Sequence, residues 1–457
     1  MNKLPFFSSF KRLFYHIDSN RCFVLNSNYF ILAIPPSLRY TDTIRYRNRF
    51  CNSYNMHMKP KKCFITGKGY IMIFGEKNIE KPIRWAMVGG GKGSQIGYIH
   101  RSAALRDFNF ELVAGAFDID PERGKEFGAN LHVAPDRCYT DYKSMFEAEA
   151  KREDGIQAVS IATPNFTHYE IAKAALKAGL HVYCEKPLCF TTEQAEELEA
   201  LVKETGKVMF ISYGYAGHQM IEEARQLIAN GDLGKIRIIN MQFAHGAHNV
   251  AVEKKSAGTA WRVDPKKSGP AYVLGDVGTH MIYLTEAMMP ELNIKRLMCK
   301  KETFVEGRQL EDNAMTTMEY DNGAVAYIWS SCVNAGSEFG FRFRIVGEKA
   351  SIAWDAEHPN QLAYEVQGKP QSVMNRGNAY LYDSALTNDR IGGGHPEGLF
   401  ESWSNLYTLF AKAIDKNEKG EAIDFAYPDI HAGVLGVKWV EKCVESADKD
   451  SAWVDYE

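Results

Sequence analysis

Lys186 is the first residue whose neighbours in the sequence suggest a chemical role. It lies in the run HVYCEKPL (181–188), directly after an apolar stretch that predicts a buried strand. The lysine therefore stands at the carboxyl end of that strand, the edge where open α/β sheets bind ligands. Pro187 restricts Lys186 to an extended conformation, so the amine is aimed, and it could stabilise an oxygen that becomes an anion. Taken alone, a Glu-Lys-Pro turn is more often an ordinary surface turn.

Asp276 and His280 form a second candidate group. The run SGPAYVLGDVGTHMIYL (268–284) predicts one helix with Ser268 as N-cap and Pro270 in its first turn. At positions i and i+4, the two side chains share one face of that helix. Histidine is well suited to take a proton from a hydroxyl near neutral pH. The alternatives are a surface pair or a core histidine, and no third ligand for a metal is evident.

The stretch WAMVGGGKGSQIGYIH (85–100) predicts the element that binds a cofactor. A short apolar run meets a tight turn and then a helix, whose first N–H groups can bind a pyrophosphate. Gly89 and Gly91 supply the first glycines of a dinucleotide pattern, but Ser94 stands where the third is expected. We interpret the loop as three residues longer than usual, with Gly97 as the close-packing glycine.

Asp118 follows the next apolar run, 21 residues after Gly97. This is close to the spacing expected of the carboxylate that binds the ribose hydroxyls. Asp120 adds a second negative charge, and two carboxylates repel a 2′-phosphate. NAD is therefore the expected cofactor and NADP is less favoured, although Arg123 keeps NADP open.

Around these residues the chain alternates short strand patterns with helical ones, as parallel βαβ units do. The pattern predicts a Rossmann domain with a doubly wound parallel sheet. The expected strands are 83–88, 110–117, 157–163, 181–184 and 207–213, and the expected helices lie near 97–107, 121–129, 167–179 and 191–205.

After about Tyr215 the pattern changes to a helix (218–230) and then to looser strands. Asn322-Gly323 between two alternating runs is a strong hairpin signal, and FRFRIVGEKASIAW predicts a second strand pair. We expect an α+β domain with a large, mainly antiparallel open sheet. The helix from Asp429 should pack back on the body. Apolar residues at helical spacing form the core face of the helix before it: Leu399, Trp403, Leu406, Phe410 and Ala413.

Length and composition indicate a globular protein of two folded domains, 81–214 and 215–457, after an unlike leader, 1–80. The net charge is −3, but residues 1–80 carry 13 Lys/Arg against 4 Asp/Glu, leaving 41 against 53 in the remainder. The main body therefore does not suit nucleic acid. No apolar run is long enough to span a membrane. The nine scattered cysteines indicate free thiols in a reducing, cytoplasmic compartment.

The leader over residues 1–80 is open to several interpretations. The best candidate for a secretory core, Tyr29 to Ile34, is too short and is stopped by two prolines. A transit peptide is an alternative, because the first 17 residues contain no acid. We favour a disordered or non-native leader with the true start at Met58 or Met72, while export or organelle targeting stays open.

Five motifs occur in one order: GGGKGSQIGYIH, Asp118, ATPNFTH (162–168), CEKPL and GDVGTH. Together they resemble the Gfo/Idh/MocA family of NAD(P)-dependent sugar and polyol oxidoreductases, over roughly residues 82 to 455. The resemblance implies that Lys186, Asp276 and His280 form the catalytic group.

The resemblance also implies which residues bind the cofactor and the substrate. The Ala-Thr-Pro-Asn stretch passes beside the nicotinamide in that family. The cofactor residues expected here are Gly89, Gly91, Gly93, Ser94, Gln95, Ile96, Asp118, Thr163, Pro164, Asn165, His168, Glu185 and Lys186. For the substrate, the family position favours Trp261 and Arg262 and the loop GGGHPEGLFESW (392–403), with His395 and Glu397. His245, in FAHGAHN, is a further candidate, although it could be an ordinary loop histidine.

We therefore expect an NAD-dependent dehydrogenase acting on a secondary hydroxyl of a sugar, glycoside or inositol. His280 would be the base, Lys186 would stabilise the alkoxide, and Asp276 would orient the imidazole or bind a neighbouring hydroxyl. NAD-assisted glycoside cleavage is one alternative. A non-catalytic NAD-binding regulatory protein is another, although such a protein would be expected to have lost Lys186 or His280. The expected assembly is a homo-dimer or homo-tetramer.

Overall fold

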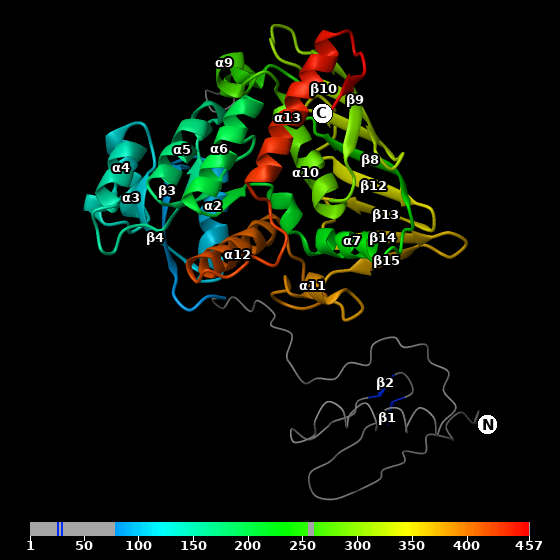
Figure 1. The fold of residues 1–457 in the computed structure, drawn as a ribbon, viewed down its shortest axis with the longest axis horizontal. Coiled ribbons are helices and arrows are strands. Elements are labelled where there is room, and N and C mark those ends of the chain that lie inside the picture. The colour runs from blue at the N-terminus through cyan, green and yellow to red at the C-terminus, as the bar shows by residue number, and fades with distance from the viewer. Residues whose placement is uncertain (1–24, 27–28, 31–77, 255–259, 457) are drawn as a thin grey trace, which may run out of the picture. The chain divides into compact units, whose positions relative to one another are not determined.

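The computed structural model describes residues 78–254 and 260–456, and before them only two short antiparallel strands, β1 (Leu25–Asn26) and β2 (Tyr29–Phe30). The chain divides into two compact units, Met1–Gly69 and Tyr70–Glu457. The leader expected over 1–80 thus lies almost wholly outside the described residues, and the following concerns the second unit (Figure 1).

Within the described residues, five parallel strands form the first sheet, in the order β4-β3-β5-β6-β7. The strand order reverses between β3 and β5, and nucleotides bind at the carboxyl ends of strands at such a point. The predicted doubly wound sheet is confirmed, with β7 shorter than predicted. The strands are β3 (Ile83–Gly89), β4 (Phe110–Ala116), β5 (Ala158–Ala162), β6 (His181–Cys184) and β7 (Met209–Ile211).

Alternate residues of β3 enter two different hydrophobic clusters, one on each face of the sheet. Trp85 and Met87 pack with α2 and α12, whereas Ala86 and Val88 pack with α5 and α6. Burial on both faces explains why these strands have almost no polar residues. The helices are α2 (Gln95–Arg106), α3 (Pro121–Asn130), α4 (Tyr142–Glu149), α5 (His168–Lys177), α6 (Thr192–Thr205) and α12 (Leu399–Glu418).

The second sheet has nine strands in the described ranges, in the order β15-β14-β13-β12-β8-β11-β10-β9-β16. The pair β8/β11 is parallel and the others are antiparallel, as the predicted hairpins require. The strands are β8 (Ile236–Ala244), β9 (Ile294–Glu302), β10 (Asn313–Tyr320), β11 (Val325–Ser331), β12 (Phe341–Gly347), β13 (Ala350–Asp355), β14 (Gln361–Val366), β15 (Ser372–Asn375) and β16 (Val454–Asp455).

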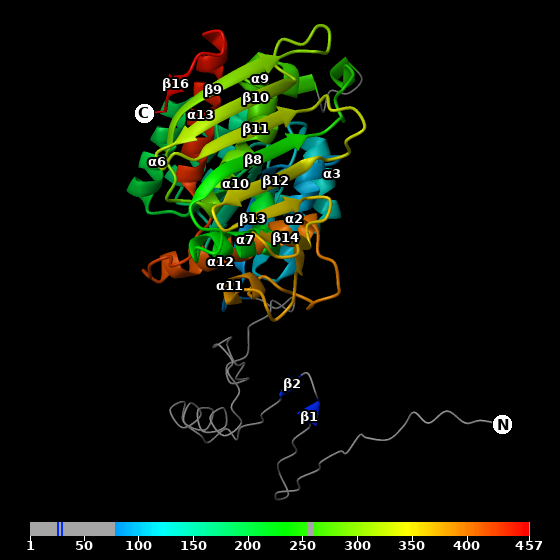
Figure 2. The same cartoon turned by 90° about the vertical axis from the view of Figure 1, so that its right-hand side faces the viewer.

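Three helices cover one face of this sheet: α7 (Gln219–Ala229), α10 (Thr279–Met288) and α13 (Ile430–Asp448). Figure 2 looks onto the strands, with these helices behind them. The short helices are η1 (Pro135–Arg137), η2 (Asn165–Thr167), η3 (Gly214–Gly217), η4 (Val252–Lys254), η5 (Trp261–Val263), α9 (Pro265–Ser268), the π-helical turn η6 (Leu274–Gly278) and α11 (Asp383–Leu386).

The single helix predicted over 268–284 is wrong. Ser268 ends α9, a separate turn whose N-cap is Asp264, with Pro265 at its first position. Gly269 follows with φ +92°, a conformation that glycine adopts readily and that breaks the helix. The chain turns helical again only at η6, which runs directly into α10.

Helix α12 comes from the C-terminal part of the chain but completes the core of the Rossmann sheet. Tyr407 stacks on Tyr183 of β6 with ring centroids 4.4 Å apart, and Phe410 stacks on Phe110 of β4. The helix also packs along α2. The expectation that the chain end packs back on the body is confirmed by α13, which contacts α6 and β9.

In the described ranges, no helix is long and apolar enough to cross a membrane. All six cysteines there are free thiols, in agreement with the expectation from their scattered positions. The other three lie outside the described residues.

Candidate active site

The loop after β3 has the backbone needed to hold a pyrophosphate. Gly89 and Gly93 have φ of +76° and +82°. A Cβ on Gly97 would lie 2.2 Å from the carbonyl oxygen of Gly90, and one on Gly91 would lie 2.5 Å from that of Phe117. Glycine is therefore required where α2 meets the strand, and the prediction that Gly97 packs there is confirmed.

Ser94 is the N-cap of α2, and its hydroxyl accepts a hydrogen bond from the N–H of Gly97 at 3.1 Å. Gln95 and Ile96 are the first residues of the helix. Their N–H groups have no intrahelical partner, because the first turn of an α-helix leaves its donors unused. The glycines and this helix start together fit the phosphates of a dinucleotide.

Asp118 lies directly beyond β4. Its carboxylate accepts hydrogen bonds from the Arg123 guanidinium at 2.7 Å and from the N–H of Asp120 at 2.9 Å. Burial raises the pKa of Asp118, but these hydrogen bonds outweigh it and hold the pKa below its ordinary value. Arg123, on which the NADP alternative depends, is thus paired with the carboxylate expected to bind the ribose.

Lys186 and Asp276 form the central contact of the site. The Lys186 amine donates to the Asp276 carboxylate at 2.9 Å and to the Asp276 backbone oxygen at 2.6 Å. Arg262 lies 3.8 Å from the other carboxylate oxygen. Burial raises the pKa of Asp276, but the positive charges of Lys186 and Arg262 outweigh it and hold the pKa well below its ordinary value. The Lys186 amine and the ionised Asp276 carboxylate are thus joined beside the sheet edge.

His280 lies in the first turn of α10 and is 5% exposed. Its ring meets the edge of Tyr215, with centroids 4.7 Å apart. Within residues 78–254 and 260–456, neither ring nitrogen makes a hydrogen bond, so Asp276 does not orient the imidazole through one. Burial, followed by the charge of Lys186, lowers the pKa of His280 well below its ordinary value. The ring is therefore neutral at pH 7 and able to accept a proton.

His168 lies behind two turns of the predicted site. It is completely buried, and its ring nitrogens lie 2.8 Å from the backbone oxygen of Thr163 and 2.9 Å from that of Pro187. Burial lowers its pKa despite these oxygens, and a neutral ring donates only one hydrogen bond at a time. His168 thus joins the Ala-Thr-Pro-Asn turn to the Glu-Lys-Pro turn, and both nitrogens point into protein, not towards a cofactor.

The other predicted residues of the Ala-Thr-Pro-Asn stretch lie between β5 and α5. The Thr163 hydroxyl accepts a hydrogen bond from the Thr167 hydroxyl at 2.6 Å. Thr163 and Pro164 are half-buried and Asn165 is buried. They thus follow the carboxyl end of a central strand, next to the point where the strand order reverses.

Glu185 ends a buried chain of hydrogen bonds that starts at the indole of Trp85. The links are Trp85 to Ser160 at 2.9 Å, Ser160 to Tyr407 at 2.7 Å, Tyr407 to His100 at 2.7 Å and His100 to Glu185 at 3.0 Å. An indole can only donate and a carboxylate can only accept, so all protons point towards Glu185. Burial raises the pKa of Glu185, but the contact with His100 outweighs it and lowers the pKa. Glu185 is thus ionised and held in place directly before Lys186.

Three of the five predicted substrate residues, Arg262, Trp261 and His245, lie at Asp276 or beside a residue that does. Arg262 lies near its carboxylate and over the ring of Trp261, 4.7 Å from the centroid. His245 follows β8, as predicted, and accepts a hydrogen bond from the N–H of Ala247 at 3.2 Å. Burial lowers the pKa of His245, while the charge of Asp276 opposes this. His245 therefore faces the same charged group.

His395 and Glu397 are the exceptions. His395 is exposed, and in the part of the chain that the structure describes its side chain makes no hydrogen bond or ion pair with Lys186, Asp276 or His280. Glu397, two residues on, is half-buried and accepts a hydrogen bond from the N–H of Arg390 at 3.1 Å. Its loop is therefore held by internal bonds, and neither residue is joined to the catalytic group.

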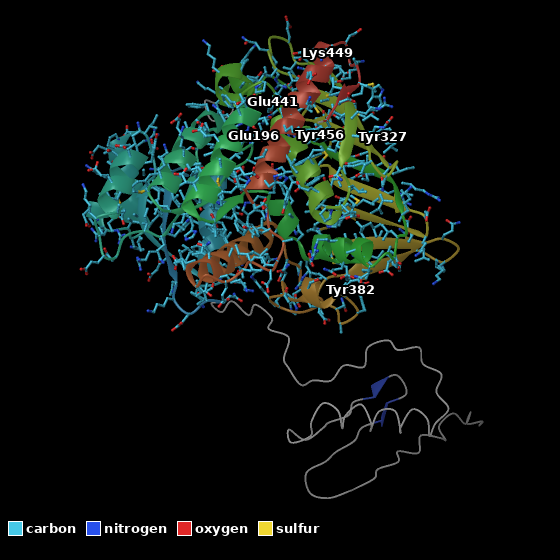
Figure 3. The ribbon with its side chains drawn as sticks, viewed as in Figure 1. Glu196, Tyr327, Tyr382, Glu441, Lys449 and Tyr456 are labelled. Atoms are coloured by element: carbon cyan, nitrogen blue, oxygen red, sulfur yellow. The ribbon has the colours of Figure 1, made fainter. Side chains whose placement is uncertain are left out.

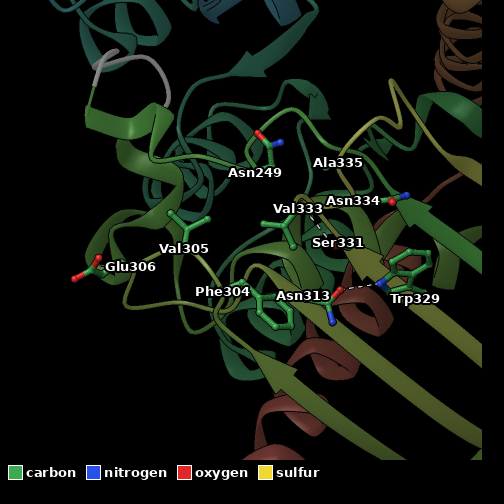
Figure 4. A pocket seen from close by; sticks show the side chains of 10 residues that line it. All are labelled: Asn249, Phe304, Val305, Glu306, Asn313, Trp329, Ser331, Val333, Asn334 and Ala335. Carbon is green, nitrogen blue, oxygen red and sulfur yellow. Dashed lines mark hydrogen bonds between the residues drawn. The ribbon is translucent and has the colours of Figure 1, made fainter.

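The loop after β8 that carries His245 and His248 is called the histidine loop below. A pocket of about 760 Å³ lies beside it, at the ends of β10 and β11 (Figure 4). The Trp329 indole donates to the Asn313 side chain at 2.7 Å across its wall. Asn334 joins the pocket to the loop through a hydrogen bond to the backbone oxygen of His245. The lining residues are Asn249, Phe304, Val305, Glu306, Asn313, Trp329, Ser331, Val333, Asn334 and Ala335. They include none of the predicted catalytic residues.

Sequence reasoning missed the residues that support the group from behind. Tyr215 covers the His280 ring, and the buried side chains of Arg308 and Glu311 bind the backbone of the histidine loop and of the turn before Asp276. None of the three stands at a motif spacing. Their roles depend on contacts between segments far apart in the sequence.

Two stretches of the chain match one oxidoreductase family, Gfo/Idh/MocA. Residues 83–213 match its NAD-binding Rossmann fold, and residues 225–456 match its C-terminal alpha/beta domain.

Solved structures and curated relatives also resemble the chain. An inositol dehydrogenase homolog from Azotobacter vinelandii, complexed with NAD+, is 62% identical with a TM-score of 0.83, covering 84% of this chain and 100% of that one. A structure of such a homolog from the same organism with NADH and myo-inositol is 61% identical, with a TM-score of 0.80 and the same coverage. The uncharacterized oxidoreductase YfiI of Bacillus subtilis is 52% identical over 392 residues, 84% of this chain and 100% of the relative.

Proposed function

Because the chain belongs to the Gfo/Idh/MocA oxidoreductase family, we propose that it oxidises a secondary ring hydroxyl of a cyclic polyol of the inositol class. The chain is an NAD-dependent oxidoreductase of sugar or polyol alcohols. The narrower substrate class is supported by the similar structure that holds NADH and myo-inositol, 61% identical over its whole length.

The observation that carries the proposal is the contact between Lys186 and Asp276 beside the buried, neutral His280. A secondary alcohol loses hydride readily only as its hydroxyl proton leaves, so the site needs a base and a group that stabilises the alkoxide. His280 supplies the base, since burial keeps its imidazole in the neutral form that can accept a proton. Lys186 supplies the positive charge.

NAD, when bound, supplies the hydride acceptor. The residues of the chain do the rest. Lys186 has a hydrogen to spare after its two contacts with Asp276, because an ammonium group carries three donors. That donor can bind the substrate oxygen, while His280 accepts its proton. In the reducing direction the protonated His280 returns the proton.

Asp276 acts through Lys186 in this proposal. Of the two roles expected from the sequence, orienting the imidazole has no hydrogen bond to support it. The carboxylate instead fixes the amine, and its second oxygen faces Arg262. That oxygen can accept a hydrogen bond from a neighbouring hydroxyl, and a polyol offers one on each adjacent carbon.

The test is NADH formation across a panel of inositol stereoisomers, free sugars, glycosides and sugar acids. We expect the highest kcat/KM among the inositols. Lys186→Ala and His280→Ala should each lower kcat by about a hundredfold or more. Lys177→Ala, on the exposed face of α5, is the matched lysine control and should keep full activity.

Two outcomes would contradict the proposal. Full activity in both catalytic variants would remove the assigned group. Release of an aglycone from a glycoside without net NADH would favour NAD-assisted glycoside cleavage instead.

We further propose that the chain forms a homo-oligomer through the bare face of the nine-stranded sheet. Ile238, Met315 and Tyr327 are 36%, 47% and 47% exposed there. Strand pairing brings them together, because Ile238 faces Val325 and Tyr327 faces Thr317. Tyr327 lies on the side of the sheet away from the Rossmann helices (Figure 3). An exposed apolar strip formed by these three side chains is typical of an interface.

A further inference from the structure

The turn that carries Asp276 begins without a cap of its own. Val273 precedes η6 and its side chain makes no capping hydrogen bond. The N–H groups at the start of a helical segment need acceptors, particularly when the segment is buried. Tyr272 and Leu274 donate theirs to one oxygen, Oε1 of Glu311, at 2.8 and 3.1 Å. The missing cap is thus supplied from elsewhere in the chain.

Glu311 lies between β9 and β10, 39 residues from Tyr272 in sequence, and is 4% exposed. A carboxylate so deeply buried costs free energy unless it is hydrogen-bonded. Its observed partners are the two backbone donors of the catalytic segment.

The backbone position of this segment sets the position of Lys186. The N–H of Asp276 donates to the backbone oxygen of Tyr272 at 2.8 Å, so the capped residue is bonded directly to Asp276. Lys186 binds the backbone oxygen of Asp276 as well as its carboxylate. A shift of the turn would therefore displace both oxygens that hold the amine.

We propose that Glu311 is a positioning residue for the reaction. It caps η6, the turn that carries Asp276, and so holds Asp276 and Lys186 in the positions that the reaction needs. The inference rests on the proposed function only in its kinetic test, which measures the rate of the proposed dehydrogenase reaction. Glu311 itself touches neither the lysine amine nor the imidazole.

The next residue secures the opposite side of the site. Asp312 accepts a hydrogen bond from Arg308 at 3.2 Å, and Arg308 donates to the backbone oxygen of His248 at 2.7 Å. His248 in turn bonds to the hydroxyl of Tyr272 through Nδ1. The β9–β10 connection therefore binds both the turn of Asp276 and the loop of His245.

The contact of Glu311 is strongest with the ionised carboxylate, but it does not require the charge. Burial raises the pKa of Glu311 to about 7, and the backbone hydrogen bonds from Leu274 and Tyr272, followed by the charge of Lys301 of β9, oppose the rise. Asp312 is the adjacent carboxylate, and the thiols of Cys299 and Cys443 face Glu311 from β9 and α13. A protonated carboxyl still has an oxygen that accepts hydrogen bonds, as does the amide of glutamine.

This gives a matched pair of variants of similar size. Glu311→Gln keeps an acceptor, and Glu311→Met removes it. We expect Glu311→Met to lower kcat by about ten- to a hundredfold, because small displacements of reacting groups have effects of that size. Glu311→Gln should recover most of that loss, and the Kd for NAD should stay within about twofold in both variants. Glu306→Gln, exposed on the same connection, is the control for charge.

Amide hydrogen exchange gives a readout that needs no activity. In the wild type, the amides of Tyr272 and Leu274 should be protected. In Glu311→Met, exchange over residues 271–278 should be faster, with Glu311→Gln close to the wild type.

The proposal is overturned if Glu311→Met keeps the wild-type kcat, or if Glu311→Gln loses as much as Glu311→Met. It is also overturned if the two amides exchange in the wild type as fast as an open loop, a result obtainable even if Glu311→Met does not fold. An inactive wild type with protected amides would count against the proposed function and leave the capping role supported.

Discussion

The carboxylate of Asp276 bonds to Lys186 and not to His280, although its spacing in the sequence pairs it with the histidine. A one-turn spacing shows which side chains share a helix face, but not which of them bond. The lysine comes from a strand end 90 residues away. Such a contact cannot be derived from local patterns, whereas the motifs alone were enough to propose Lys186, Asp276 and His280 as the catalytic group.

Asp276→Asn should distinguish the contact of Lys186 with the Asp276 carboxylate from its contact with the Asp276 backbone oxygen. The variant keeps the backbone oxygen but removes the negative charge that faces Lys186 and Arg262. We expect kcat to fall by about ten- to a hundredfold, since a charge-assisted hydrogen bond is replaced by a weaker neutral one. Steady-state kinetics measure this, with Asp448→Asn as an exposed control. An unchanged kcat would show that the amine needs no counter-ion.

The pH dependence of oxidation should reflect the lowered pKa of His280. The reaction needs the neutral imidazole, which is present above the folded pKa. Because burial and Lys186 place that pKa well below 6.5, kcat/KM should stay level from pH 8 down past 6.5 and fall only at lower pH. Removing the charge in Lys186→Met should raise the pKa and move the acid limb upwards. A wild-type limb at or above pH 6.5 would contradict the assignment.

At the scale of elements, the strands and hairpins were predictable and the catalytic helix was not. Short runs of apolar residues and the Asn322-Gly323 turn are local patterns that predict strands and a hairpin. The structure contains the strands predicted from them. Two helix starts compete over residues 264–284. Asp264 and Pro265 form the stronger one, a capped proline start, and Gly269 then ends that helix. Helix α4 was overlooked although Asp141 gives an N-cap signal, without a proline after it.

The close approach of α2 to the glycine loop makes a sharp prediction about the cofactor. In Gly97→Ala, the new Cβ would meet the backbone of Gly90 at 2.2 Å, so the helix start must move. We expect a loss of about 1–3 kcal/mol in the free energy of unfolding and an NAD Kd raised by about tenfold or more.

Gly124→Ala in α3 is the matched control, because its Cβ would have no neighbour closer than 3.6 Å. Calorimetry of NAD binding and thermal unfolding test both variants. Equal affinity in Gly97→Ala and the wild type would show that the helix start does not hold the phosphates.

At the scale of the molecule, the bare sheet face predicts an assembly. Tyr327→Glu places a charge in the apolar strip of Ile238, Met315 and Tyr327, and burying an unpaired charge in an interface is costly. We expect a shift to smaller species in sedimentation or light scattering, at unchanged folding. Val373→Glu, 49% exposed on β15 near the sheet edge, is the control. A wild type that is already monomeric would contradict the proposed interface.

Helix α12 has a consequence for how the protein is made. The boundary expected near residue 214 separates the Rossmann domain from the α+β domain in the sequence. Tyr407 and Phe410 lie far beyond it, yet they supply rings to the core around β3, β4 and β6. Tyr407 also completes the hydrogen-bond chain that ends at Glu185. A nascent chain emerging from the ribosome therefore cannot seal one face of the five-stranded sheet until residues 399–418 have been synthesised. The Rossmann domain is continuous in sequence, but its core is completed by a helix that follows the second sheet.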